Sequence, residues 1–385
     1  MARVIPASGP QRVPIAVWAR HAREEAFRLL ERIAAQPYVF GHVAAMPDLH
    51  AAEGVAVGTV FATEGVIVPA ALGGDLGCGV AALRFDAGAL PLSTRALQRI
   101  LAGWADRIPV GDEVRRGASV PVPERLLAAP LSTRSLEHVR DRLAPQQFGT
   151  LGGGNHFVEL DRDVDGNAWL LVHTGSRGLG GAIGRHHASA AAAGGIGTIP
   201  GLEVASEAGR ACVSDVAWAC AFAAANRAAI VDEAARVVSE VSGVAPDPAS
   251  HLDVRHNFVA EEEHFERRLW VHRKGAIAAA GGAPVLIPGS MGTASYLADG
   301  LGEATSFRSA SHGAGRVMSR REARQRIGAE RLERSMRRVV HDARRARSLV
   351  EEAPAAYRDV REVLEDEVDL VRPRVRLEPM VVLKG

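Results

Sequence analysis

The chain has 385 residues, of which 47% are hydrophobic and 24% are charged, as in an ordinary globular protein. This balance excludes a disordered or collagen-like chain, and three scattered cysteines do not make a disulfide framework. With 46 basic and 45 acidic residues, the net charge indicates no particular partner. We see no signal peptide and no apolar run long enough to span a bilayer, so we expect a cytoplasmic protein without membrane contact.

The first half of the chain mixes helical and strand patterns. Apolar residues at helical spacing predict helices over residues 18–34, 90–108 and 123–143. A glycine-punctuated stretch at residues 38–85 predicts strands, including 66–68 and 80–85, and a further buried strand is expected at 168–172, just before His173.

The second half is organised around one long helical pattern. Residues 188–200 are rich in Ala and Gly and indicate a flexible loop. Residues 203–241 predict one long helix or a broken pair, in which Cys212 and Cys220 are interpreted as small core residues. Short strands are expected at 269–272, 285–287 and 380–383. No repeat or linker is evident, so we predict a single α+β domain over residues 1–385, with mixed and antiparallel sheets flanked by helices.

Charge is distributed unevenly near the carboxyl end. Residues 316–347 hold 12 arginines and four acidic residues, whereas residues 351–369 hold eight acidic residues and two arginines. A charge run is usually a solvated helix face. The basic helical segment 316–347 is also consistent with an RNA-facing surface. Lysine is rare, and Lys274 and Lys384 are therefore flagged for specific roles that arginine would not fill.

Five glycine-rich loops carry most of the chemically interesting side chains. They span residues 73–79, 152–159, 173–178, 255–258 and 311–316. Glycine permits positive φ and close approach of the backbone to a ligand, but a single such loop is weak evidence. Each of these loops also contains a metal-competent residue, and together they supply Asp75, Cys78, His156, His173, His256 and His312.

The mixture of ligand types narrows the choice of metal. One thiolate, one carboxylate and several imidazoles suit Mn, Fe, Co or Zn better than Mg or Ca. If the Cys78 sulfur bridges two metal ions, the set could hold both of them. The alternative is an isolated buried cysteine beside a turn aspartate, and a neutral histidine can be either a ligand or a nucleophile.

Taken together, the loops resemble the RtcB family of GTP-dependent RNA-splicing ligases over residues 41–385. The resemblance extends to Pro47-Asp48-Leu49-His50, Asn226-Arg227, His272-Arg273-Lys274-Gly275-Ala276, the run from Pro288 to Tyr296, and Lys384-Gly385. It implies an RtcB-like fold and an enzyme that joins RNA 3′-phosphate or 2′,3′-cyclic phosphate ends to 5′-hydroxyl ends.

The resemblance also implies roles for individual residues. Asp75, Cys78 and His156 would hold one Mn²⁺, while Cys78, His173 and His256 would hold a second, and His312 would be the nucleophile that takes GMP from GTP. The implied guanylate contacts are Asn155, His156, Phe157, Val158, Glu159, His256, Asn257, Pro288, Gly289, Ser290, Met291, Ser295, His312, Gly313, Ala314, Gly315 and Lys384.

Two other activities compete with ligation. A Mn-dependent nucleotidyltransferase or phosphodiesterase could cap or trim RNA ends without sealing them. A non-catalytic RNA-binding relative is disfavoured, because every ligand type and His312 are present. The implied partners are RNA with broken or spliced ends, including tRNA, and an activator such as archease, which some family members use.

Overall fold

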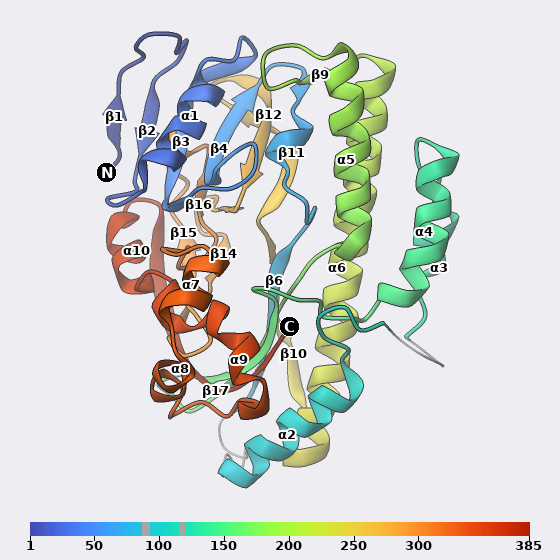
Figure 1. The fold of residues 1–385 in the computed structure, drawn as a ribbon, viewed down its shortest axis with the longest axis vertical. Helices are drawn as coiled ribbons and strands as arrows, with labels where there is room; N and C mark the ends of the chain where they lie inside the picture. The colour runs from blue at the N-terminus through green and yellow to red at the C-terminus, as the bar shows by residue number, and fades with distance from the viewer. Residues whose placement is uncertain (87–92, 115–119) are drawn as a thin grey trace.

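The computed structural model describes residues 1–86, 93–114 and 120–385. Two large sheets lie next to each other, with the long helices α5 and α6 along one side and short carboxyl-terminal helices at another (Figure 1). Helices and mostly antiparallel strands are interspersed along the chain, which confirms the predicted α+β class.

The first sheet has six strands in the order β1–β2–β3–β4–β12–β11. Their bounds are β1 Arg3–Ile5, β2 Ile15–Val17, β3 Val39–His50, β4 Val57–Thr63, β12 Arg267–Lys274 and β11 Asn257–His264. The β2–β3 pair is parallel and the other pairs are antiparallel. Helix α1, Glu24–Ala34, contacts β3, and the apolar core between them includes Leu30, Ile33 and Val43.

The second sheet has seven antiparallel strands in the order β10–β6–β8–β7–β17–β15–β14. Their bounds are β10 Pro246–Arg255, β6 Gly79–Phe85, β8 Ala168–Thr174, β7 Phe157–Arg162, β17 Val371–Lys384, β15 Ser295–Gly300 and β14 Pro284–Ile287. Two small pairs complete the strands: β13 Ala276–Ala278 with β16 Ser309–Ser311, and β5 Val66–Ile67 with β9 Leu202–Glu203.

Helices cover one face of the seven-stranded sheet. Apolar side chains of α2, Thr94–Arg107, and α6, Glu207–Ser242, pack there against β6, β7 and β8. Helix α6 is unbroken over 36 residues. Ser206 caps its first turn by accepting a hydrogen bond from the Gly209 N–H, and Gly243 ends it in the left-handed conformation. Cys212 and Cys220 are buried on α6, as predicted for core residues.

The remaining helices are shorter or lie at the margins of the sheets. Their bounds are α3 Glu124–Ala128, α4 Arg134–Gln147, α5 Arg177–Gly194, α7 Arg320–Arg326, α8 Ala329–Ser335, α9 Ala346–Leu349 and α10 Val360–Asp366. The basic segment 316–347 therefore consists of short helical pieces joined by turns. Among the described residues, no helix has both the length and the apolar character needed to cross a bilayer.

The predicted boundaries differ most clearly for three helices, and the short strand expected at 380–383 is the end of the longer β17. The helix expected over 18–34 begins at Glu24, because residues 15–17 pair with β1 and β3. The helix expected over 90–108 is described from Thr94, and residues 90–92 lie outside the described residues. The helix expected over 123–143 is two helices, since Pro130 follows the end of α3 and Thr133 caps α4.

The loop expected at residues 188–200 is wrong for its first part. Residues 188–194 form the last two turns of α5, which contacts α6. Alanine is the strongest helix former, so the alanine run extends the helix until the consecutive glycines Gly194 and Gly195. Beyond them, Ile196 and Gly201 exchange backbone hydrogen bonds and close a short turn.

Candidate active site

The sheet order brings the metal-competent residues to one edge. Asp75 and Cys78 precede β6, His156 precedes β7, His173 lies near the end of β8, and His256 follows β10. Because these four strands are antiparallel neighbours, the start of β6, the start of β7, the end of β8 and the end of β10 meet at the same edge. Loops far apart in sequence thus converge.

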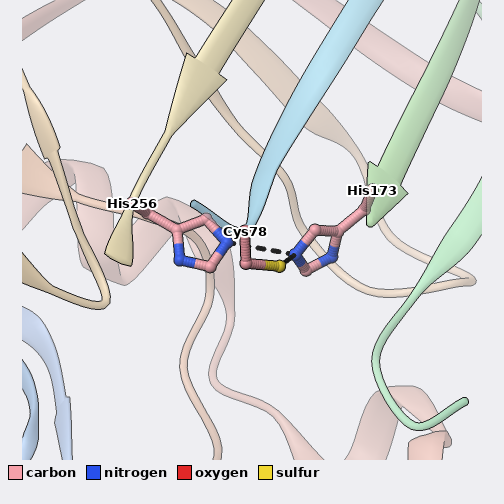
Figure 2. A group of neighbouring side chains, drawn as sticks. All are labelled: Cys78, His173 and His256. Atoms are coloured by element: carbon pink, nitrogen blue, oxygen red, sulfur yellow. Dashed lines mark hydrogen bonds between the residues drawn. The ribbon is translucent and has the colours of Figure 1, made fainter. Parts of the chain in front are cut away.

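Two triads of ligand atoms share the sulfur of Cys78. The first consists of Asp75, Cys78 and His156, and the second of Cys78, His173 and His256. The Cys78 Sγ lies 3.5 Å from His156 Nε2 and 3.3 Å from His173 Nε2. His156 Nε2 is 3.0 Å from Asp75 Oδ2, and the Nε2 atoms of His173 and His256 are 3.1 Å apart. Figure 2 shows the two imidazoles of the second triad on either side of Cys78.

The chemistry of this donor set fits divalent cations. His156 Nδ1 lies 2.9 Å from the Leu151 carbonyl oxygen and donates to it, which leaves the Nε2 lone pair free for a metal. Burial holds the pKa values of His173 and His256 well below the usual range, so both rings are neutral. Burial raises the pKa of the Cys78 thiol well above its usual value, and a bound cation would displace that proton.

A partly buried arginine lies beside the first triad. Arg177 begins α5 with a positive φ of 58°, and its NH1 is 3.5 Å from His156 Nδ1. Gly152 makes room for it, since a Cβ there would lie 2.1 Å from the guanidinium carbon. The third glycine-rich loop contained this residue, but nothing in the sequence indicated its contact with the second loop.

His312 lies next to the second triad and is oriented by a carboxylate. The ring centroids of His256 and His312 are 4.7 Å apart. His312 Nδ1 lies 2.5 Å from Oδ2 of the fully buried Asp48, and the same oxygen accepts from the His312 backbone N–H at 3.1 Å. Asp48 thus holds the proton on Nδ1, so the lone pair is on Nε2, as a nucleophile requires.

Glycine allows the loop of His312 to close over Asp48. Gly315 has a positive φ of 69°, and a Cβ at this position would lie 2.6 Å from the Asp48 carbonyl oxygen. Asp48 belongs to the Pro47–His50 motif quoted above, but no role was assigned to it from sequence. Its role follows from the fold, which places β3 beside the 312–315 loop and brings Asp48 to His312.

One cavity of about 660 Å³ contains the site, a volume typical of small-molecule pockets. All five candidate metal ligands line it, as does His312. So do the expected guanylate contacts Asn155, Phe157, Glu159, Asn257, Pro288, Gly289, Ser290, Met291, Ser295, Gly313, Ala314, Gly315 and Lys384. Val158 does not line the cavity, because its side chain faces the opposite side of β7 and packs with α2 and α6.

Lys384 reaches the cavity through strand pairing. It pairs with Phe157 in the β17–β7 register, and its Nζ donates to the Asn155 carbonyl oxygen at 2.8 Å and lies 5.4 Å from the Phe157 ring centroid. The other flagged lysine, Lys274, is not among the lining residues and instead donates to the Glu53 carbonyl oxygen at 2.8 Å.

A buried carboxylate links the basic segment to this cavity. Glu352 lies 3.8 Å from Lys384 Nζ, accepts from Arg316 at 3.1 Å and Arg320 at 3.2 Å, and is hydrogen-bonded by the Tyr357 hydroxyl. All five residues line the cavity. Sequence reasoning assigned Glu352 to a solvated acidic run, and no local pattern distinguishes it from the exposed acids nearby.

The fold and the site together define a candidate metalloprotein in which a carboxylate-oriented histidine faces a ligand cavity. The profile of the family described as tRNA-splicing ligase RtcB matches residues 29–385, and the chain belongs to the RtcB family. It is 33% identical to the RNA-splicing ligase RtcB of Escherichia coli strain K12, over 97% of this chain and 98% of that relative.

Two further relatives come from distant organisms. The chain is 33% identical to the RNA-splicing ligase RtcB of Mycobacterium tuberculosis, with 89% of this chain and 96% of the relative covered. It is 30% identical to the tRNA-splicing ligase RtcB of Pyrobaculum aerophilum, over 97% of this chain and 95% of the relative. These matches confirm the resemblance inferred from the motifs.

Proposed function

We propose that the protein is a Mn²⁺- and GTP-dependent RNA ligase that joins 3′-phosphate or 2′,3′-cyclic phosphate ends to 5′-hydroxyl ends. The observation that carries the proposal is the placement of the Asp48–His312 pair beside two triads that share Cys78, within one cavity. Membership of the RtcB family supports RNA as the substrate class.

Asp75, Cys78 and His156 would hold one ion, and Cys78, His173 and His256 the other. When bound, such ions would neutralise charge on phosphate oxygens and position them for in-line displacement. The chain's own contribution is three imidazoles, one carboxylate and one sulfur, held at four strand ends.

Asp48 and His312 account for activation of the RNA end. A phosphomonoester is a poor electrophile, because attack on it would have to expel an oxide. His312 Nε2 would attack the α-phosphorus of GTP, forming a P–N bond as pyrophosphate leaves with the electrons of the broken P–O bond. The RNA 3′-phosphate would then take GMP from His312, and the 5′-hydroxyl would displace GMP to form the phosphodiester. A cyclic phosphate would first be hydrolysed to the 3′-phosphate.

Arginines would hold the RNA backbone. Arg23, Arg316 and Arg320 line the same cavity as His312, and guanidinium groups bind phosphate with paired hydrogen bonds. Helix α7 adds the exposed Arg321 directly after Arg320 of the cavity lining. We expect binding to weaken steeply with salt, as for other phosphate-backbone contacts.

Ligation with defined ends tests the proposal. The purified protein is incubated with Mn²⁺, labelled GTP and RNA bearing 3′-phosphate, cyclic phosphate or 3′-hydroxyl ends, each with a 5′-hydroxyl partner strand. We expect joined RNA from the first two and none from the third. His312→Ala should abolish both the protein–GMP adduct and joining, whereas the matched variant His138→Ala, on the exposed face of α4, should retain both.

The alternative activity has a distinct result. A His312-dependent adduct and capped or trimmed ends, without joined RNA, would identify a nucleotidyltransferase or phosphodiesterase in place of a ligase. An arm with added archease separates an intrinsically inactive enzyme from one that requires an activator.

A further inference from the structure

Two carboxyl groups lie side by side on the buried face of β7. Glu159 is 2% exposed and Asp161 is fully buried. Their neighbours Val158 and Leu160 point to the opposite face and pack with α2 and α6. Since side chains alternate along a strand, Glu159 and Asp161 share the other face, where their β8 partners Leu171 and Trp169 belong to an apolar cluster.

The pair lacks the donors that two ionised carboxylates would need. Among the described residues, no hydrogen-bond donor reaches either carboxyl oxygen of Asp161. Its neighbour is Glu159, which is also an acceptor when ionised. Burying an unpaired carboxylate in apolar surroundings is costly, so one proton must lie between the two groups.

Charges from β17 favour one location for that proton. The ammonium group of Lys384 acts on Glu159 and favours its ionised form, whereas Glu378 acts on Asp161 and disfavours ionisation there. Burial raises the pKa of Asp161 well above the usual range, while that of Glu159 is raised only to about 7. Asp161, whose carboxyl oxygens receive no donor among the described residues and which lies outside the cavity, is therefore the protonated partner and donates to Glu159.

The two residues also differ in their access to ligand. Glu159 lines the nucleotide cavity and Asp161 does not. A carboxylate that faces a nucleobase accepts from the adjacent N1–H and 2-amino groups of guanine, whereas adenine presents an unprotonated N1 at the same edge. A buried acceptor that matches one base discriminates strongly against a base that cannot donate to it.

We propose that Asp161 is a positioning residue for nucleotide specificity: its proton is donated to Glu159, so that Glu159 remains an acceptor directed at the guanine base. The inference rests on the proposed function, because it requires a guanine nucleotide in this cavity. Asp161 acts through Glu159 and contacts no substrate itself.

Three substitutions in the full-length protein separate this role from simple packing. Asp161→Asn retains a donor without a titratable proton, Asp161→Leu removes the donor while filling the apolar space, and Asp165→Asn alters an exposed carboxylate in the same hairpin. Formation of the covalent protein–GMP or protein–AMP adduct is measured between pH 6 and 9, with thermal unfolding recorded for each variant.

In the unsubstituted protein, we expect the KM for GTP to rise as pH falls through about 7, because protonated Glu159 loses its acceptor character. Asp161→Asn and Asp165→Asn should preserve the preference for GTP over ATP. Asp161→Leu should raise the KM for GTP roughly tenfold at pH 7, the effect of one lost hydrogen bond to a charged group, and move the rise to higher pH. A purely structural role would lower the unfolding temperature without changing the GTP-to-ATP ratio or the pH profile.

The outcomes distinguish the two proposals. If the unsubstituted protein forms no adduct with GTP, with or without added archease, the proposed function fails. If it forms the adduct with a clear preference for GTP and Asp161→Leu, still folded, keeps that preference and pH profile, the role of Asp161 alone is overturned. Infrared difference spectra provide a direct check: the spectrum of the unsubstituted protein minus that of Asp161→Asn should contain one protonated carboxyl band, because buried acids common to both proteins cancel.

Discussion

His312 Nδ1 and Asp48 Oδ2 lie 2.5 Å apart, although 264 residues separate them in the chain. The oxygen also accepts from the His312 backbone N–H, so both the ring and the loop are held by one carboxylate. This contact determines which ring nitrogen carries the lone pair toward the cavity.

Asp48→Asn should therefore impair nucleotide transfer more than folding. The amide can place its N–H against Nδ1, which would favour the wrong tautomer, and we expect guanylylation to fall by about 10²–10⁴-fold. Rapid-quench measurement of the adduct checks this, with thermal unfolding as the control for structure. A rate within threefold of the unsubstituted protein would contradict the orienting role.

Cys78→Ser should reduce metal binding at both positions. The alcohol is a much poorer anionic ligand than the thiol, and it replaces an atom common to both triads. We expect the bound Mn²⁺, measured by equilibrium dialysis, to fall from two ions to fewer than one per chain. Cys212→Ala, at a buried cysteine on α6 outside the cavity, is the matched control and should still bind two ions.

Glu367→Gln should flatten the pH dependence of stability. Glu367 is buried against Ser311, whose N–H and hydroxyl donate to it at 2.9 and 2.6 Å, and burial raises its pKa to about 8 from 4.5. Between these values the unfolded chain releases a proton that the folded protein keeps. The free energy of unfolding should therefore fall as pH rises from 4.5 to 8, by up to about 1.4 kcal/mol per pH unit from this group.

Urea unfolding between pH 5 and 9 measures this effect. The glutamine variant should lose the Glu367 contribution to the slope, while Glu362→Gln, at an exposed position of helix α10, which Glu367 directly follows, should keep it. Equal slopes in all three proteins would contradict the assignment of a protonated Glu367.

Gly152→Ala should be far more damaging than Gly111→Ala. Both glycines have positive φ, so both substitutions carry about 1 kcal/mol of backbone strain. A Cβ at residue 152 would also collide with the Arg177 guanidinium, whereas nothing lies within 4 Å at residue 111. Thermal unfolding and adduct formation should show a larger loss for the first variant, and similar behaviour of the two would indicate that Arg177 moves freely.

The sequence predicted the α+β class, and its motifs contained the five candidate metal ligands and His312, which line one cavity. It did not predict strand β10 or β11, although His256 lies between them: β10 begins with two prolines among its first three residues, and β11 contains three consecutive glutamates. Val158 was included among the guanylate contacts because it stands within a motif. Side chains alternate along β7, however, and that of Val158 packs in the apolar core with α2 and α6. The roles of Asp48 and Glu352 could not be predicted, because each role depends on contacts with residues far away in the sequence, to His312 and to Lys384 respectively.

The shared sulfur makes the two candidate metal positions interdependent. Cys78 is a member of each triad, so a single oxidation to a sulfenic acid would withdraw a ligand from both in one event. Such oxidation would therefore not leave an enzyme with one metal position intact. Reduction of the Cys78 sulfur back to the thiol would restore both positions.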